Sequence, residues 1–125
     1  MAVINSDEEI LQTLELIIQA DGYSTAAVKL HELQERGVEG YIEKVKPKVI
    51  VWDINDPVDE NIRQLDRFKR SKIAEGKGLL VVTPFTDEVG IFSKRVGMPV
   101  MNLDELFKRS FSETMKEYLG AGGKE

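Results

Sequence analysis

Two unbroken apolar runs dominate the hydrophobic pattern of the chain. Residues 49–52 are Val-Ile-Val-Trp and residues 79–82 are Leu-Leu-Val-Val. Continuous runs of this length are typical of strands that are buried on both faces of a parallel sheet. Shorter apolar stretches predict three more strands, at residues 2–5, 23–27 and 99–101.

Apolar side chains at helical spacing separate these strands. Ile10, Leu14 and Ile18 predict a first helix that ends near residue 21. Ser6 and Glu9 have the spacing of a capping box at its start. Further helices are predicted over residues 38–45 and 59–71, from a cap at Thr86 or Asp87 to a stop at Gly97, and over residues 103–119.

The alternation of five strands with five helices predicts a doubly wound α/β domain. Its parallel sheet is expected to have the flavodoxin-like strand order 2-1-3-4-5, with helices on both faces. The chain of 125 residues has room for one such domain, which we assign to residues 1–119. The glycine-rich residues 120–125 are expected to form a disordered tail.

Charge and composition exclude several classes of partner. Lys and Arg number 17 against 22 Asp and Glu, a net charge of -5, which disfavours nucleic acid. Neither apolar run approaches the roughly 20 residues that cross a bilayer, so no membrane partner is expected. The absence of cysteine excludes disulfides and thiol catalysis and suits a cytoplasmic location.

Candidate chemistry is expected where the strands end. In doubly wound folds the site lies outside the carboxyl ends of the strands. Those positions hold Asn5, Ser6, Asp53, Thr83 and Asn102. Glycine-rich phosphate loops and nucleophile elbows are missing from the sequence, which disfavours nucleotide binding and hydrolysis.

Three segments resemble response-regulator receiver domains of two-component signalling, and the resemblance covers nearly the whole chain. Residues 49–57, Val-Ile-Val-Trp-Asp-Ile-Asn-Asp-Pro, are similar to the phosphoacceptor strand and its turn. Residues 79–83 resemble the strand that ends in the switch hydroxyl, and residues 102–106 the entry to the last helix. The resemblance places Asp53 at the phosphoacceptor position, Thr83 at the switch hydroxyl, and Asn55 and Pro57 in the turn.

The sequence departs from the receiver pattern at three positions, as in an atypical or pseudo-receiver. The family's acidic pair falls on Asn5 and Ser6, and its lysine falls on Asn102. In the family, the acidic pair, the phosphoacceptor and a carbonyl, here that of Asn55, hold Mg²⁺. One lost charge contact at about 4 Å removes up to roughly 4 kcal/mol, or about a thousandfold in affinity. We therefore expect no cofactor beyond a weak Mg²⁺ site, and Asp53 to be a slow phosphoacceptor or none.

These residues also have purely structural interpretations. Asp53 can cap the turn that follows its strand, Thr83 is a β-branched strand residue, and Ser6 is a helix cap. Trp52 is expected in the core, where its indole N–H needs a partner. His31 has no metal-ligating cluster around it in the sequence and is expected to be solvated.

Three functions remain open. The first is a stand-alone receiver or pseudo-receiver in a phosphorelay, without enzymatic activity, which docks a histidine kinase, an adaptor, an output protein or its own copy. The second is a genuine phosphoacceptor switched by a histidine kinase, and the third is a small α/β enzyme on the same fold. Docking is expected on the face of the fourth helix, fifth strand and fifth helix. Ile91, Val100, Met101 and Phe107 are its candidate apolar anchors, of which one or two must serve the core.

Overall fold

A five-stranded, all-parallel sheet forms the centre of the molecule. The structure, a computed structural model, describes residues 1–5, 8–29, 37–108 and 113–114. The strands are β1 (Ala2–Asn5), β2 (Ala26–Lys29), β3 (Val49–Asp53), β4 (Gly78–Thr83) and β5 (Val100–Asn102). They pair in the order β2-β1-β3-β4-β5 and every pairing is parallel. The predicted fold class and strand order are therefore confirmed.

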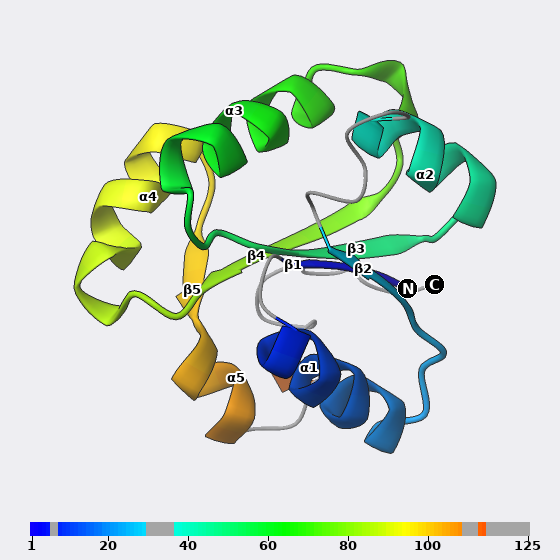
Figure 1. The fold of residues 1–125 in the computed structure, drawn as a ribbon, viewed down its shortest axis with the longest axis horizontal. Coiled ribbons are helices and arrows are strands. Elements are labelled where there is room, and N and C mark those ends of the chain that lie inside the picture. Colours follow the sequence, from blue (N-terminus) through cyan, green and yellow to red (C-terminus); the bar gives the residue numbers. More distant parts are fainter. Residues whose placement is uncertain (6–7, 30–36, 109–112, 115–125) are drawn as a thin grey trace.

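Helices cover both faces of the sheet. They are α1 (Glu8–Ala20), α2 (Gly37–Val45), α3 (Val58–Lys69), α4 (Val89–Val96) and α5 (Leu103–Lys108). Figure 1 shows α2, α3 and α4 above the sheet and α1 and α5 below it. None of the helices in the described ranges is long and apolar enough to cross a membrane.

The unbroken apolar run of β3 is explained by these two helical layers. Successive strand residues point to opposite faces, so both sets must be apolar when both faces are covered. Ile50 and Trp52 pack in the cluster under α2, α3 and α4. Val49 and Val51 pack in the second cluster, against α1 and α5. All four side chains are buried.

The second strand lies later in the chain than the predicted residues 23–27. Tyr23 lies in the turn that closes the end of α1, where its amide donates to the carbonyl of Ile18 at 3.3 Å. Pairing with β1 begins only at Ala26, whose amide donates to the carbonyl of Met1 at 2.8 Å. The half-buried residues of this edge strand give a weaker apolar signal than those of β3.

The start of α4 also differs from the prediction. A 3₁₀ turn, Thr86–Glu88, precedes the helix, and neither Thr86 nor Asp87 caps it. The predicted stop is confirmed: Gly97 has φ 71°, and its amide donates to the carbonyl of Ser93 at 3.0 Å. Glycine reaches this left-handed conformation without steric cost. Lys69 of α3 donates to the carbonyl of Val96 in the same last turn.

Some predictions fall outside the described residues. These are the capping box at Ser6, His31, the continuation of the last helix to residue 119, and the tail at residues 120–125. Leu103 and Leu106, the first two residues of the predicted apolar face of that helix, are buried in the core.

Candidate functional site

The polar residues that end the strands meet at one edge of the sheet. In sheet order the five strands end on Lys29, Asn5, Asp53, Thr83 and Asn102. Asp53 pairs with Val82, so Thr83 lies one residue beyond it on the neighbouring strand, and Thr83 pairs with Asn102. The structure therefore brings Asp53, Thr83 and Asn102 together, as the strand ends predict. The side chain of Asn5 and all of Ser6 lie outside the described residues.

Asp53 is buried at this edge, with 1% of the residue exposed to solvent. The amide nitrogen Nδ2 of Asn55 lies 3.5 Å from its Oδ2 atom, at the long limit of a hydrogen bond. The Oδ1 atom of Asn55 accepts a hydrogen bond from the backbone amide of Asp56 at 2.8 Å. Asn55 thus holds the turn and orients its own amide toward the carboxylate.

Asn61 is a site residue that the sequence analysis did not identify. It lies on α3 and is buried, although α3 is otherwise rich in exposed charged residues. Its Nδ2 atom donates to the backbone carbonyls of Asp53, at 3.0 Å, and Asn55, at 3.3 Å. Its Oδ1 atom accepts from the indole N–H of Trp52 at 2.7 Å. Asn61 therefore supplies the partner that Trp52 was expected to need and fixes the turn after Asp53.

The Thr83 hydroxyl joins the two loops that flank the carboxylate. It donates to the carbonyl of Ile54 at 2.9 Å and accepts from the amide of Phe85 at 3.2 Å. The residue is fully buried. Its donor hydrogen is therefore used within the protein, and a switch in which this hydroxyl binds a phosphoryl group would first have to break the bond to Ile54.

Asn102 caps α5 and ties it to the loop after β4. Its Oδ1 atom accepts from the amide of Asp104 at 2.9 Å, as an N-cap residue does. Its Nδ2 atom donates to the Thr86 hydroxyl at 3.1 Å and lies 3.5 Å from the carbonyl of Thr83. Asn102, which the sequence analysis expected at the family's lysine position, thus has a structural role in the fold.

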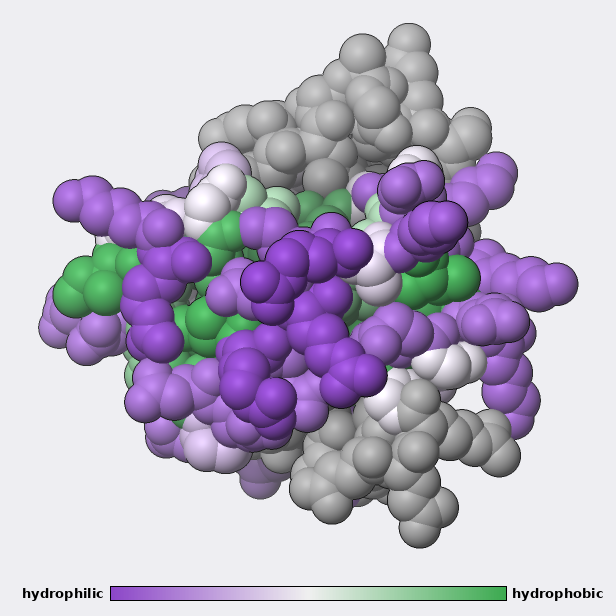
Figure 2. Space-filling view, turned by 90° about the horizontal axis from the view of Figure 1, so that it is seen from above, coloured by the Kyte–Doolittle hydropathy of each residue, from purple (hydrophilic) through white to green (hydrophobic). Residues whose placement is uncertain are grey.

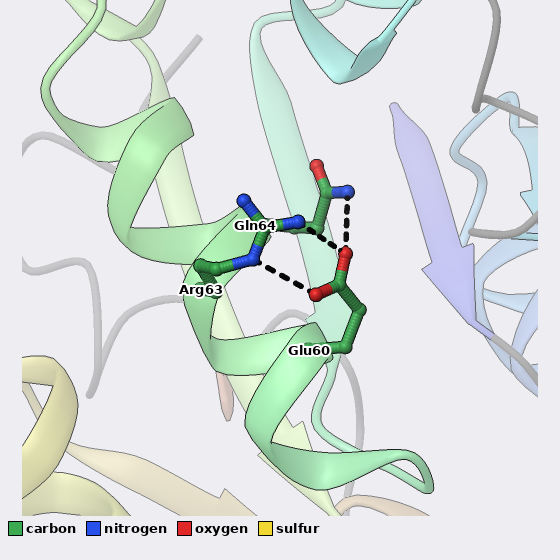
Figure 3. Close-up of polar contacts among 3 residues, drawn as sticks. All are labelled: Glu60, Arg63 and Gln64. Carbon is green, nitrogen blue, oxygen red and sulfur yellow. Dashed lines mark hydrogen bonds and ion pairs between the residues drawn. The ribbon is translucent and has the colours of Figure 1, made fainter.

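A charged cluster on α3 lies just beyond the turn. The Nε atom of Arg63 donates to a carboxylate oxygen of Glu60 at 2.8 Å, and Gln64 donates to the other oxygen at 3.2 Å (Figure 3). The hydrogen bond from Arg63 is the main reason why the pKa of Glu60 is lowered from 4.5. Because these side chains are exposed, the cluster stabilises the surface of α3 and does not reach Asp53.

Among the described residues, the strand ends offer few ligands for a magnesium ion. Asp53 is the one carboxylate among the five residues that end the strands. The carbonyl of Asn55 already accepts a hydrogen bond from Asn61. Mg²⁺ in proteins requires near-octahedral oxygen ligands, usually including carboxylates. Within the described ranges, no three His, Cys, Asp or Glu side chains form a group that could hold a metal ion.

Two of the four candidate anchors on the expected docking face serve the core, within the one or two that the sequence led us to expect. Val100 and Met101 are buried, because β5 is covered by α4 on one face and by α1 and α5 on the other. They serve the core and cannot anchor a partner. Ile91 is 55% exposed and remains a candidate anchor. The side chain of Phe107 lies outside the described residues.

Comparison with solved structures identifies the fold. The chain superimposes on the Vibrio cholerae chemotaxis protein CheY4, crystallised at pH 4.0, with a TM-score of 0.65 and 19% identity over 94% of this chain and 95% of that chain. A second structure of this chemotaxis response regulator gives a TM-score of 0.59 at 19% identity, covering 86% of this chain and 91% of that one. No protein-family model and no curated protein matches the sequence. The chain therefore has the fold of CheY-type receiver domains.

Proposed function

We propose that this chain is an atypical receiver domain that acts in phosphorelay signalling by docking protein partners. In this proposal Asp53 holds the phosphoacceptor position but accepts a phosphoryl group slowly or not at all. The observation that carries the proposal is that polar side chains near Asp53 make hydrogen bonds within the fold. The Thr83 hydroxyl donates to Ile54 and Asn102 caps α5, so both side chains are committed to holding the fold.

The charge balance at the strand ends supports the same proposal. Phosphoryl transfer depends mainly on neutralising negative charge and on positioning the reacting groups. Asn102 offers no positive charge where receivers carry a lysine, and Asn5 and Ser6 offer no negative charge to hold a metal ion. The buried Asp53 carboxylate therefore lacks the groups that would make its phosphorylated form stable.

A docking role also accounts for the hydrogen-bonded architecture of the strand-end loops without requiring an enzymatic step. Asn61 and Thr83 fix the loops after β3 and β4 through buried hydrogen bonds. Rigid loops of this kind suit recognition by a protein partner, because little entropy is lost when they are bound. The proposed partners are a histidine kinase, an adaptor or an output protein, and we propose a cytoplasmic location.

A genuine phosphoacceptor remains the second candidate. The position of Asp53 at the carboxyl edge of the sheet and the turn formed by Asn55 and Pro57 favour it. The two candidates differ in the affinity that they predict for Mg²⁺ at this site.

The test is a magnesium titration followed by the fluorescence of Trp52, the only tryptophan, which precedes Asp53. The proposal predicts that the double variant Asn5→Asp with Ser6→Asp binds Mg²⁺ at least about tenfold more tightly than the wild type. Asp53→Asn in the double variant serves as the control and should abolish the gain. Wild-type binding as tight as that of the double variant would favour the second candidate.

A further inference from the structure

A groove lies between the loop after β3 and the α4 helix, close to the strand ends. Its volume is about 360 Å³. This falls within the range of roughly 300–1,000 Å³ that is usual for binding pockets. Val58, at the start of α3, and Phe85, in the loop after β4, line it together with Ile91 and Phe92 of α4.

The groove offers apolar surface to a partner. The rings of Phe85 and Phe92 meet edge to face, with their centroids 6.3 Å apart, and so form a rigid wall. Phe92 is buried, whereas Ile91 is one of two large apolar side chains that are exposed among the described residues. Figure 2 looks onto the face formed by α2, α3 and α4, and shows hydrophobic surface at the left, where α4 lies, bordered by hydrophilic side chains.

The charges around the groove are predominantly acidic. Asp56 and Glu88 line it, and the exposed Asp87 adjoins Glu88. Arg95 is the one basic lining residue, and it pairs with Asp59 at 3.1 Å. In the described part of the chain, no ion pair offsets the charges of Asp56, Asp87 or Glu88. Three negative charges therefore surround an apolar surface.

Two hydrogen bonds connect the groove to the strand ends. Phe85 donates its amide to the Thr83 hydroxyl, which in turn donates to the carbonyl of Ile54, next to Asp53. Asp56 and Val58, on the opposite wall, belong to the turn that follows Asp53. A partner in the groove would therefore contact both loops that flank the carboxylate.

We propose that this groove is a docking site for a protein segment that inserts an apolar side chain and carries Lys or Arg on either side of it. This inference rests on the proposed docking function and names its surface and the chemistry of its partner. The apolar wall supplies the anchor site, and the acidic rim selects basic flanks by charge complementarity. A second copy of this chain fits poorly. Leu16, the other large apolar side chain that is exposed among the described residues, lies on α1, which has no basic residue.

The test is an NMR titration of the full ¹⁵N-labelled chain with a ten-residue synthetic peptide. The peptide has two central leucines and two arginines on each side, and a control peptide replaces the arginines with glutamates. We expect saturable shifts in the amide signals of Val58, Phe85 and Ile91. The glutamate peptide should bind at least about tenfold more weakly, and added salt should weaken the arginine peptide.

Matched variants distinguish binding in the groove from non-specific binding to exposed apolar side chains. Ile91→Gln should weaken binding of the arginine peptide about tenfold or more, as should Glu88→Lys. Leu16→Gln removes an apolar side chain that is even more exposed, 70% against 55% for Ile91, and should leave the affinity unchanged. Circular dichroism spectra identical to the wild type confirm that the variants fold.

Several results would overturn the inference. These are shifts that map elsewhere, equal binding of the two peptides, or an Ile91→Gln variant that binds like the wild type. Phenol bound as tightly as the peptide would indicate a small-molecule pocket, and self-association abolished by Ile91→Gln would make a second copy the occupant. If the arginine peptide does not bind the groove and the wild type binds Mg²⁺ weakly, only the docking site inferred here is refuted. If the wild type binds Mg²⁺ tightly, the proposed function is refuted, with or without peptide binding.

Discussion

Asn61 connects the hydrophobic core to the turn that follows Asp53. One side chain satisfies the indole N–H of Trp52 and the carbonyls of Asp53 and Asn55. Buried polar groups that lose a partner keep their desolvation cost, which is about 1–3 kcal/mol for each unsatisfied group. The network therefore stabilises both the core and the geometry of the turn.

We predict that Asn61→Ala lowers the free energy of unfolding by roughly 2–4 kcal/mol, because it leaves the Trp52 indole buried without an acceptor. Urea denaturation followed by tryptophan fluorescence measures the change. Gln64→Ala is the control on the same helix, since its hydrogen bond to Glu60 is exposed, and should cost at most about 0.5 kcal/mol. An Asn61 variant as stable as the Gln64 variant would contradict this role.

The structural role of Asn102 gives a second prediction. Asn102→Ala should destabilise the protein by about 1 kcal/mol, because the amide of Asp104 loses its cap. Asn102→Ser keeps a capping oxygen and should lose less than half as much. Thermal unfolding of the three proteins measures the order of stability. Equal stability of the wild type and the alanine variant would show that the cap contributes nothing.

The strand-end residues could be predicted from the sequence. Asn61 could not be predicted from the ends of the strands, because it lies within a helix. Asp53 and Thr83 directly follow the apolar runs of two strands, so their place at the edge follows from the parallel sheet. Asn61 lies within a helix whose other polar residues are solvated. Its spacing from Leu65 and Phe68, four and seven residues later, puts it on the apolar face of α3. That spacing, together with the hydrogen-bond acceptor that the buried indole N–H of Trp52 requires, is the sequence feature that indicates a buried role for Asn61.

At the scale of elements, the charged face of α3 predicts a defined pH dependence. The folded-state pKa of Glu60 lies below 4.5, chiefly because Arg63 donates to its carboxylate. The contribution of this pair to stability is therefore present above that pH and is lost as the pH falls through the folded-state pKa. We expect Glu60→Gln to lower the urea midpoint at about pH 7, and this effect to shrink as the pH falls toward about 3.

Arg63→Gln is the matched control, because it removes the other partner of the same pair. It should lower the midpoint at about pH 7 in the same direction as Glu60→Gln. A Glu60→Gln effect that persists unchanged at the lower pH would show that the ion pair is not its cause. The exposure of both side chains means that the effect should also shrink in high salt.

The elements differ in how well the sequence predicted them, for a physical reason. β3 and β4 are covered by helices on both faces, so nearly every residue must be apolar and the pattern is unmistakable. β2 lies at the sheet edge and is only half buried, so its pattern is weaker and its predicted position was three residues too early. The 3₁₀ turn before α4 was missed because Thr86 and Asp87 favour turns as strongly as helix caps.

At the scale of the whole molecule, the sheet separates two apolar clusters and gathers the polar strand ends at one edge. One cluster lies under α2, α3 and α4, and the other lies against α1 and α5. The groove at α4 opens beside this edge and is lined by the loops that follow β3 and β4. The fold thus places the proposed docking groove next to the buried carboxylate of Asp53.

The most direct test of this account is incubation of the full chain with acetyl phosphate and Mg²⁺, followed by intact mass spectrometry. The account predicts slow gain or no gain of a phosphoryl group by the wild type. It predicts rapid gain of one by the variant Asn5→Asp with Ser6→Asp and Asn102→Lys, which restores the missing charges. Rapid gain of one phosphoryl group by the wild type, abolished by Asp53→Ala, would contradict the account.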